Sequence, residues 1–208
     1  MMQNLSFILF VFGFMFFLGF SCLKAEEQDI FSPEDHCVAY TTPEKILFFP
    51  DYLVIGKNCN VKAWVENNDN KIRFMVNIPL KSFDSGISAR DDDVMEILDA
   101  DNYPNIRFET DWFSKVKIKK ILLDGLGEVN GVLMVSGREY LISLDMIFTR
   151  KGKNYSFSGT LDTNYTFFNL NPPKLGIFAE VINIIKIVVN LQSDQIIGSG
   201  LQLHRYYS

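Results

Sequence analysis

The chain has 208 residues, of which 48% are hydrophobic, and a formal net charge of −5 at pH 7. This length suits one domain with a substantial core, and two domains would be cramped. The acidic balance argues against a nucleic-acid partner, because phosphate contact relies on clustered Lys and Arg. The basic run at residues 115–120 alternates like the solvated face of a strand or a hairpin arm.

In chain order, the first predicted element is a phenylalanine-rich apolar leader at residues 5–23. Its length matches a signal-peptide core, and Ala25 offers a cleavage position before a polar stretch, so residues 1–25 are predicted to be a signal peptide. The rest of the chain is then expected to be periplasmic or secreted. Two alternatives stay open: lipid anchoring through Cys22, and an uncleaved leader that associates with a membrane.

Residues 26–44 are predicted to form an N-terminal arm, because the stretch that follows the leader is polar. Cys37 and Cys59 are the cysteines that remain beyond the leader. In an oxidising compartment such a pair can form a disulfide. The sequence leaves this open, because spacing does not show whether the two Cβ atoms meet.

Residues 45–195 are dominated by the period-two alternation of strands that bury one face. Alternating or β-branched stretches lie at residues 73–80, 106–112, 129–135, 140–148, 155–162 and 181–192. Short polar or glycine-containing connections favour antiparallel neighbours, and closure into a barrel would remove the sheet edges. The pattern therefore predicts an all-β barrel, followed by a C-terminal tail at residues 196–208.

One segment, at residues 91–100, departs from the strand pattern. Val94, Ile97 and Leu98 follow helical spacing, and Asp91 or Asp92 can cap the start of a helix. The helix is expected to end before Tyr103, because the following proline favours extended geometry there. Helix capping therefore explains the aspartate cluster better than a metal site does.

The same region carries a family resemblance. SFDSGISARDDD, then the predicted helix, then NYPNIRFET resembles the motif of the YceI family of exported lipocalin-like proteins. The matching positions are Ser82, Ser85, Gly86, Arg90, Asp91, Tyr103, Pro104, Ile106 and Phe108. The segments at residues 127–146 and 169–191 also look like the family's hairpin and closing strand. The chain departs from the family at Asp92 and Asp93, where a histidine is common.

The resemblance implies an eight-stranded antiparallel lipocalin-like barrel with one short helix, which holds a polyisoprenoid or fatty-acid derivative. Arg90 is a candidate to meet a polar head group at the mouth of the barrel, and the alternative is that it pairs with a nearby aspartate. No cofactor or metal is expected besides the bound lipid. The predicted inward residues are Phe74, Val76, Ile78, Phe108, Trp112, Leu133, Tyr140, Ile142, Leu144 and Phe157.

The leading hypothesis is thus an exported, non-enzymatic carrier of a long apolar ligand. The alternative is a filled barrel that serves as an interaction or structural protein of the cell envelope, and a homodimer through the arm or the tail stays open. A hydrolase is the remote alternative, because neither histidine, His36 or His204, sits in a recognisable catalytic motif. Co-purified lipid would separate the first two hypotheses.

Overall fold

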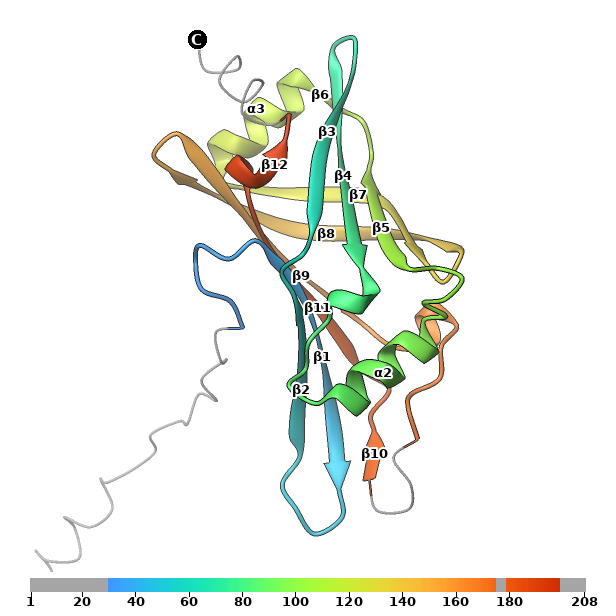
Figure 1. Ribbon diagram of the computed structural model, residues 1–208. Helices are drawn as coiled ribbons and strands as arrows, with labels where there is room; N and C mark the ends of the chain where they lie inside the picture. The colour runs from blue at the N-terminus through green and yellow to red at the C-terminus, as the bar shows by residue number, and fades with distance from the viewer. Residues whose placement is uncertain (1–29, 175–178, 199–208) are drawn as a thin grey trace, which may run out of the picture.

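A computed structural model describes residues 30–174 and 179–198 (Figure 1). These residues form one curled 12-stranded sheet with two α-helices beside it. The predicted signal peptide at residues 1–25 lies outside the described residues, as does most of the predicted tail. No helix within the described ranges is long and apolar enough to cross a membrane.

The strands are β1 (Cys37–Ile46), β2 (Tyr52–Asn58), β3 (Lys62–Asn68), β4 (Lys71–Pro79), β5 (Asn105–Thr110), β6 (Phe113–Ser114), β7 (Leu126–Val135), β8 (Arg138–Lys151), β9 (Asn154–Thr163), β10 (Ala179–Val181), β11 (Ile185–Gln192) and β12 (Ile196–Ile197). The helices are α2 (Ser88–Ile97) and α3 (Lys115–Asp124), with short 3-10 turns η1 (Leu80–Ser82), η2 (Thr166–Phe168) and η3 (Ser193–Gln195).

The sheet order is β10-β1-β11-β9-β8-β7-β5-β4-β3-β12, with β2 also paired to β1 and β6 to β4. All of these pairings are antiparallel except that of β12 with β3. Within the described chain β2 and β3 follow one another without a ladder between them. The sheet is therefore a half-barrel of 12 strands, which corrects the prediction of a closed barrel of eight.

Part of the difference in strand number comes from interrupted strands. The predicted strand at residues 181–192 is broken between β10 and β11, both of which pair with β1. At the break the Asn183 side chain turns away and forms hydrogen bonds with the backbone N–H and the hydroxyl of Thr166. Such a bulge bends a strand without ending its role in the sheet.

The second half of the predicted N-terminal arm is a central strand instead. β1 pairs with β2 on one edge and with β10 and β11 on the other. Cys37, Val38, Ala39, Thr41 and Thr42 are all buried, so both faces of β1 are covered. A strand buried on both faces lacks the period-two signal, which explains why the prediction placed this segment in an arm.

The basic run forms helix α3, not the strand that was predicted. Ile118, Ile121 and Leu122 follow helical spacing and are buried, while the lysines around them are exposed. The hydroxyl of Ser114 caps the helix by accepting a hydrogen bond from the Lys117 N–H. Gly125 ends it at φ 70°, a left-handed conformation that favours glycine.

Helix α2 exists where a helix was predicted but starts at Ser88, earlier than residue 91. Its N-cap residue is Ile87, which makes no side-chain capping bond. Asp91 instead lies in the first turn and accepts a hydrogen bond from the Ser85 N–H at 2.9 Å. The carboxylate thus ties the preceding loop to the helix while it favours the helix dipole. The predicted tail also begins within the sheet, because Ile196 and Ile197 form β12.

Candidate ligand-binding cavity

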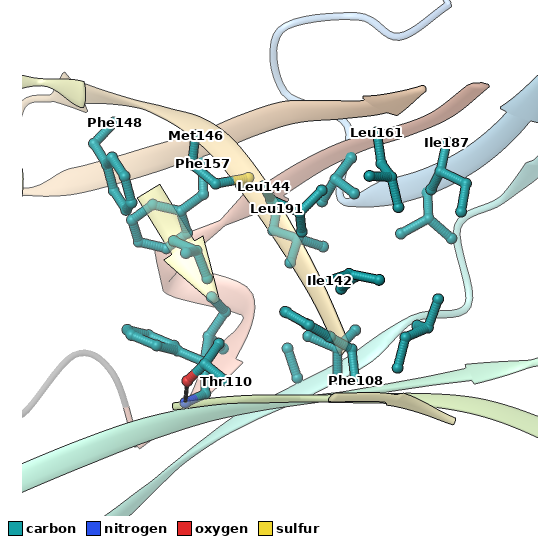
Figure 2. Close-up of a pocket in the computed structure, with 18 of the residues that line it drawn as sticks. Phe108, Thr110, Ile142, Leu144, Met146, Phe148, Phe157, Leu161, Ile187 and Leu191 are labelled. Atoms are coloured by element: carbon teal, nitrogen blue, oxygen red, sulfur yellow. Dashed lines mark hydrogen bonds between the residues drawn. The ribbon is translucent and has the colours of Figure 1, made fainter. Parts of the chain in front are cut away.

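An apolar cavity of about 120 Å³ lies inside the curl of the sheet (Figure 2). Strands β4, β5, β7, β8, β9 and β11 contribute its walls, and helix α3 contributes Ile118, Ile121 and Leu122. Figure 2 shows Phe148 and Phe157 on one side and Phe108 with Thr110 on the other.

Among the described residues that line this cavity, Thr110 is the one with a polar side chain, and its hydroxyl is already engaged. The Thr110 Oγ1 accepts a hydrogen bond from the Phe74 N–H and donates one to the Asp111 carbonyl, each at 2.9 Å. A ligand in this cavity therefore meets hydrocarbon on all sides. Such a site favours an apolar chain over a polar molecule of similar size.

Most of the predicted inward residues line this cavity. The alternation of each strand brings them to the same side of the sheet, because successive side chains point to opposite faces. The residues concerned are Phe74, Val76, Ile78, Phe108, Leu133, Ile142, Leu144 and Phe157.

Trp112 does not belong to this group. Its side chain is 37% exposed, and the Arg73 guanidinium lies over its ring at 4.9 Å from the ring centre. The alternation that includes Phe108 and Thr110 ends at a break between β5 and β6, which both pair with β4. The predicted inward position of Trp112 is wrong because the strand bulges immediately before it.

Tyr140 is buried, as expected of an inward residue, but it does not line the cavity. Its hydroxyl donates a hydrogen bond to the Phe168 carbonyl at 2.7 Å. The Tyr140 ring also packs edge-on against the Phe168 ring. Tyr140 therefore holds η2 in place.

A second apolar cavity of about 140 Å³ lies between the sheet, helix α2 and η2. Its walls include Val94 and Ile97 of α2 and Phe168 of η2. The two cavities are neighbouring compartments of one interior, since they share four lining residues. These are Val38, Ile78, Leu133 and Ile187.

A third, more polar cavity of about 200 Å³ follows the second. The two share lining residues, namely Tyr40, Val94, Tyr165 and Pro173. The third cavity adds Thr42, Glu44, Arg90 and Asp93. The interior thus runs from a fully apolar end near α3 to a polar mouth beside α2.

Arg90 lines the third cavity, at this mouth. Its Nη2 forms an ion pair with Glu44 Oε2 at 3.4 Å, and its guanidinium lies 5.9 Å from the centre of the Tyr52 ring. The Glu44 side chain is only 7% exposed, so the pair is largely shielded from water. A ligand head group at Arg90 would therefore compete with Glu44 or join an existing pair.

Tyr40 is a mouth residue that the sequence did not indicate. Its hydroxyl is buried and has no hydrogen-bond partner within the described residues. Burial, reinforced by the nearby Asp91 carboxylate, raises the pKa of Tyr40 above its usual value of 10.0, so the phenol stays neutral. A side chain at Gly56 would collide with the Tyr40 ring, so this glycine on β2 lets the ring lie flat. That glycine within a strand was the available sequence signal.

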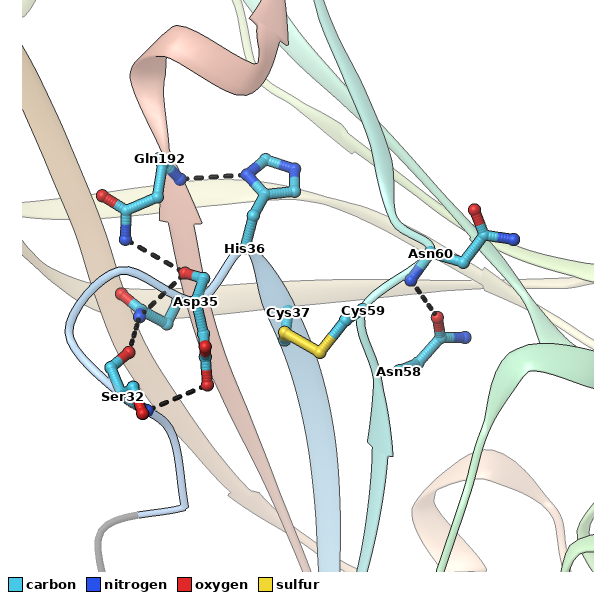
Figure 3. Close-up of a disulfide and its surroundings, with 9 residues drawn as sticks. Ser32, Asp35, His36, Cys37, Asn58, Cys59, Asn60 and Gln192 are labelled. Atoms are coloured by element: carbon cyan, nitrogen blue, oxygen red, sulfur yellow. Dashed lines mark hydrogen bonds between the residues drawn. A yellow bond between two sulfur atoms is a disulfide. The ribbon is translucent and has the colours of Figure 1, made fainter.

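Away from the mouth, Cys37 and Cys59 form a disulfide that links the start of β1 to the residue after β2 (Figure 3). The neighbouring His36 is buried, and its Nδ1 accepts a hydrogen bond from the Gln192 N–H at 3.0 Å. His36 therefore ties the start of β1 to the end of β11. The other histidine, His204, lies outside the described residues.

No group of His, Cys, Asp and Glu side chains in residues 30–174 and 179–198 is arranged to hold a metal ion. The aspartates of α2 have other partners or face solvent. The Asp91 carboxylate accepts a hydrogen bond from the Ser85 N–H, and Asp92 and Asp93 are exposed.

A curled antiparallel sheet around a slender apolar interior defines a class of β-proteins suited to holding one small apolar molecule. Within that class, the chain belongs to the YceI family: the model of the YceI-like domain matches residues 54–193, more than half of the chain. No curated protein matches the chain.

Several solved structures share the fold. BcnA of Burkholderia cenocepacia is 18% identical with a TM-score of 0.54, over 75% of this chain and 95% of its own. The Campylobacter jejuni YceI protein is 17% identical with a TM-score of 0.55, over 71% and 88%. A polyisoprenoid binding domain from Saccharophagus degradans, implicated in plant cell wall breakdown, is 11% identical with a TM-score of 0.55, over 74% and 92%.

Proposed function

We propose that this protein is an exported, non-enzymatic carrier of a long apolar molecule, a polyisoprenoid or fatty-acid derivative, held in the half-barrel interior. The observation that carries the proposal is the succession of two apolar compartments that share lining residues and end at a polar mouth. The polyisoprenoid binding domain among the similar structures supports the same ligand class.

The energetics favour a ligand that spans both compartments. Each CH₂ group that leaves water contributes about 0.8 kcal/mol, so a chain that reaches from the mouth to α3 gains more than one that fills a single compartment. The side chains of Val38, Ile78, Leu133 and Ile187 lie between the compartments and would have to shift to admit it. The ligand's polar head would then remain at the mouth, near Tyr40 and Arg90.

Export is proposed from the apolar leader and is supported by the disulfide. Disulfides persist in oxidising compartments and are rare in the cytosol. A carrier in the periplasm or outside the cell has a physical purpose, because an isoprenoid or acyl chain cannot cross water unaided.

The direct test is mass spectrometry of organic extracts from the protein, produced with its own leader and purified without detergent. A stoichiometric apolar compound is the expected result. An empty extract, together with no uptake of added isoprenoids or fatty acids, would contradict the carrier and favour a filled barrel that acts as an interaction or structural protein.

A matched pair of variants on β8 ties the uptake to the interior. Ile142 lines the first cavity, whereas the adjacent Leu141 is 83% exposed on the opposite face. Ile142→Trp should fill the cavity and reduce uptake by about tenfold or more, and Leu141→Trp should leave it unchanged. Equal uptake by both variants would place the ligand elsewhere.

A further inference from the structure

The turn between β1 and β2 exposes three consecutive large apolar side chains. The exposed fractions are 53% for Leu47, 93% for Phe48 and 69% for Phe49. Figure 1 shows this hairpin extending beyond α2 and β10 at the lower end of the molecule. Soluble proteins rarely present a contiguous apolar group on a protruding turn. Such a surface usually marks a site that binds a partner or a membrane.

The backbone of the turn adds an independent observation. Phe48 has a φ of 71°, in the left-handed region that glycine and asparagine adopt readily and bulky residues adopt at a cost. A glycine there would relieve the strain without loss of packing, because the Phe48 side chain is almost fully exposed. A strained, exposed phenylalanine on a turn therefore supports the hypothesis of a contact outside the molecule.

Polarity rises in steps behind the tip. Tyr52, 51% exposed, lies opposite Glu44 in the β1–β2 ladder, and the exposed Lys45 flanks the turn. Tyrosine places an apolar ring and a polar hydroxyl at the boundary between hydrocarbon and water, and a lysine can extend its amine back to water. The ion pair of Glu44 with Arg90 lies one step further back. This gradient matches the profile of a lipid interface.

The charges near the tip offset one another. Lys45 lies opposite Glu180 in the β1–β10 ladder, Lys174 forms a β-bridge with Glu180, and Asp51 follows the turn. Attraction to an anionic surface is therefore weak. A stable protein interface usually buries on the order of 1,000 Å² or more, whereas a narrow turn with three apolar side chains suits shallow insertion into a bilayer.

We propose that residues 47–49 insert into the surface of a neutral lipid bilayer and seat the polar mouth against it. Tyr52 connects the two features, because its ring lies 5.9 Å from the Arg90 guanidinium in the third cavity. The inference goes beyond the carrier function and does not depend on which ligand is bound.

The test places a reporter at the tip of the full-length chain. Phe48→Trp is mixed with phosphatidylcholine vesicles that contain brominated lipid, and the quenching of the parent's own tryptophans is subtracted. Leu141→Trp is the control, because Leu141 is also highly exposed but lies on β8, which β9 and β11 separate from β1. After this subtraction the quenching reports on the added tryptophan, and binding through the leader alone would not favour position 48 over position 141.

Strong quenching at position 48, little at position 141, and no change between about 0.1 M and about 1 M salt is the expected result. Phe49→Asp, added to the reporter variant, should weaken the partitioning of the tip by about tenfold or more. Equal quenching at both positions, or at neither, would overturn the proposal. Loss of quenching in high salt would overturn the neutral-lipid assignment. A blue shift that grows with protein concentration in the absence of vesicles would instead assign the tip to a second copy of the chain.

Discussion

At the scale of single residues, a substitution at Tyr40 is predicted to affect ligand binding but not to lower stability. Its buried hydroxyl lacks a partner among the described residues, and leaving such a group unsatisfied costs roughly 1–3 kcal/mol. Tyr40→Phe should therefore leave the free energy of unfolding of the empty protein unchanged or raise it by about 1 kcal/mol.

The same substitution should weaken binding of a ligand with a polar head several-fold, because the unpaired Tyr40 hydroxyl at the mouth can donate a hydrogen bond to that head. A hydrocarbon of the same length, without a head group, serves as the control and should bind equally to both proteins. Chemical denaturation and titration with the two ligands measure the two effects. Equal loss for both ligands would mean that Tyr40 shapes the cavity and does not contact the head.

Thr110 is predicted to contribute through its hydroxyl. Thr110→Val keeps the shape of the side chain but removes the acceptor of the Phe74 N–H, so the free energy of unfolding should fall by about 1–3 kcal/mol. Thr149→Val, at an exposed position on β8, is the matched control and should change stability by less than about 0.5 kcal/mol. Urea unfolding of both variants is the measurement. Similar values for the two would show that the Thr110 hydrogen bonds add nothing to stability.

Residue patterns predicted much of the candidate site because strand alternation assigns faces reliably. Phe74, Val76 and Ile78 line the interior as their spacing indicated. The prediction that Trp112 points inward was wrong because a bulge between β5 and β6 reverses which side chains face the interior. A bulge depends on the pairing with the partner strand, which the local pattern does not show. Tyr40 was missed because β1 is buried on both faces. Its residue pattern therefore does not indicate which side chains point into the interior.

At the scale of elements, the disulfide is predicted to stabilise the β1–β2 hairpin. Cys37 and Cys59 are separated by 22 residues, and closing a loop of that size contributes about 3 kcal/mol in the chain-entropy account. The double variant Cys37→Ala, Cys59→Ala should lose about that much free energy of unfolding. Urea unfolding with and without reductant is the measurement: the parent should weaken on reduction and the double variant should not. A parent that is insensitive to full reduction would contradict the prediction.

Helix α3 shows why element type is harder to predict than burial. Lysines at residues 115, 117 and 119 mimic a strand's polar face, while Ile118, Ile121 and Leu122 carry the helical spacing. A strand-like period of two and a helical period are thus present in the same short segment. The N-cap at Ser114 and the C-cap at Gly125 favour the helix. For α2 the existence of the helix followed from the sequence, but its first residue did not, because no side chain caps it.

At the scale of the whole molecule, His36 links acidity to stability. Burial lowers the pKa of His36 below its usual value of 6.5, although the charge of Asp194 acts in the opposite direction. Below pH 6.5 the unfolded chain therefore binds more protons than the folded one, and the free energy of unfolding should fall as the pH drops.

His36→Asn keeps a side-chain oxygen to accept the Gln192 N–H but does not titrate. Its stability should fall less than that of the parent between about pH 7 and about pH 5, as measured by urea midpoints. An identical fall in both proteins would show that other groups set the acid sensitivity.

The overall class of fold followed from the sequence, but the way the sheet curls did not. Alternation is local, whereas the pairing of β1 with β11 joins Cys37 to Asn190 across most of the described chain. Nothing in a local pattern specifies that partner. For the same reason the sequence predicted a closed barrel. Whether β2 and β3 pair depends on the assembled sheet, and in the described chain they do not.

The two edges of β1 become available at different times as the chain is made. β2 follows within a few residues, so the hairpin and its disulfide can form early, from local chain alone. The other edge pairs with β10 and β11, which are made much later, and contacts so distant along the chain form slowly. We therefore expect the hairpin to form before β10 and β11 pair with the other edge of β1. A chain halted before β11 would keep an open strand edge beside an uncovered apolar interior, which is a state prone to aggregation.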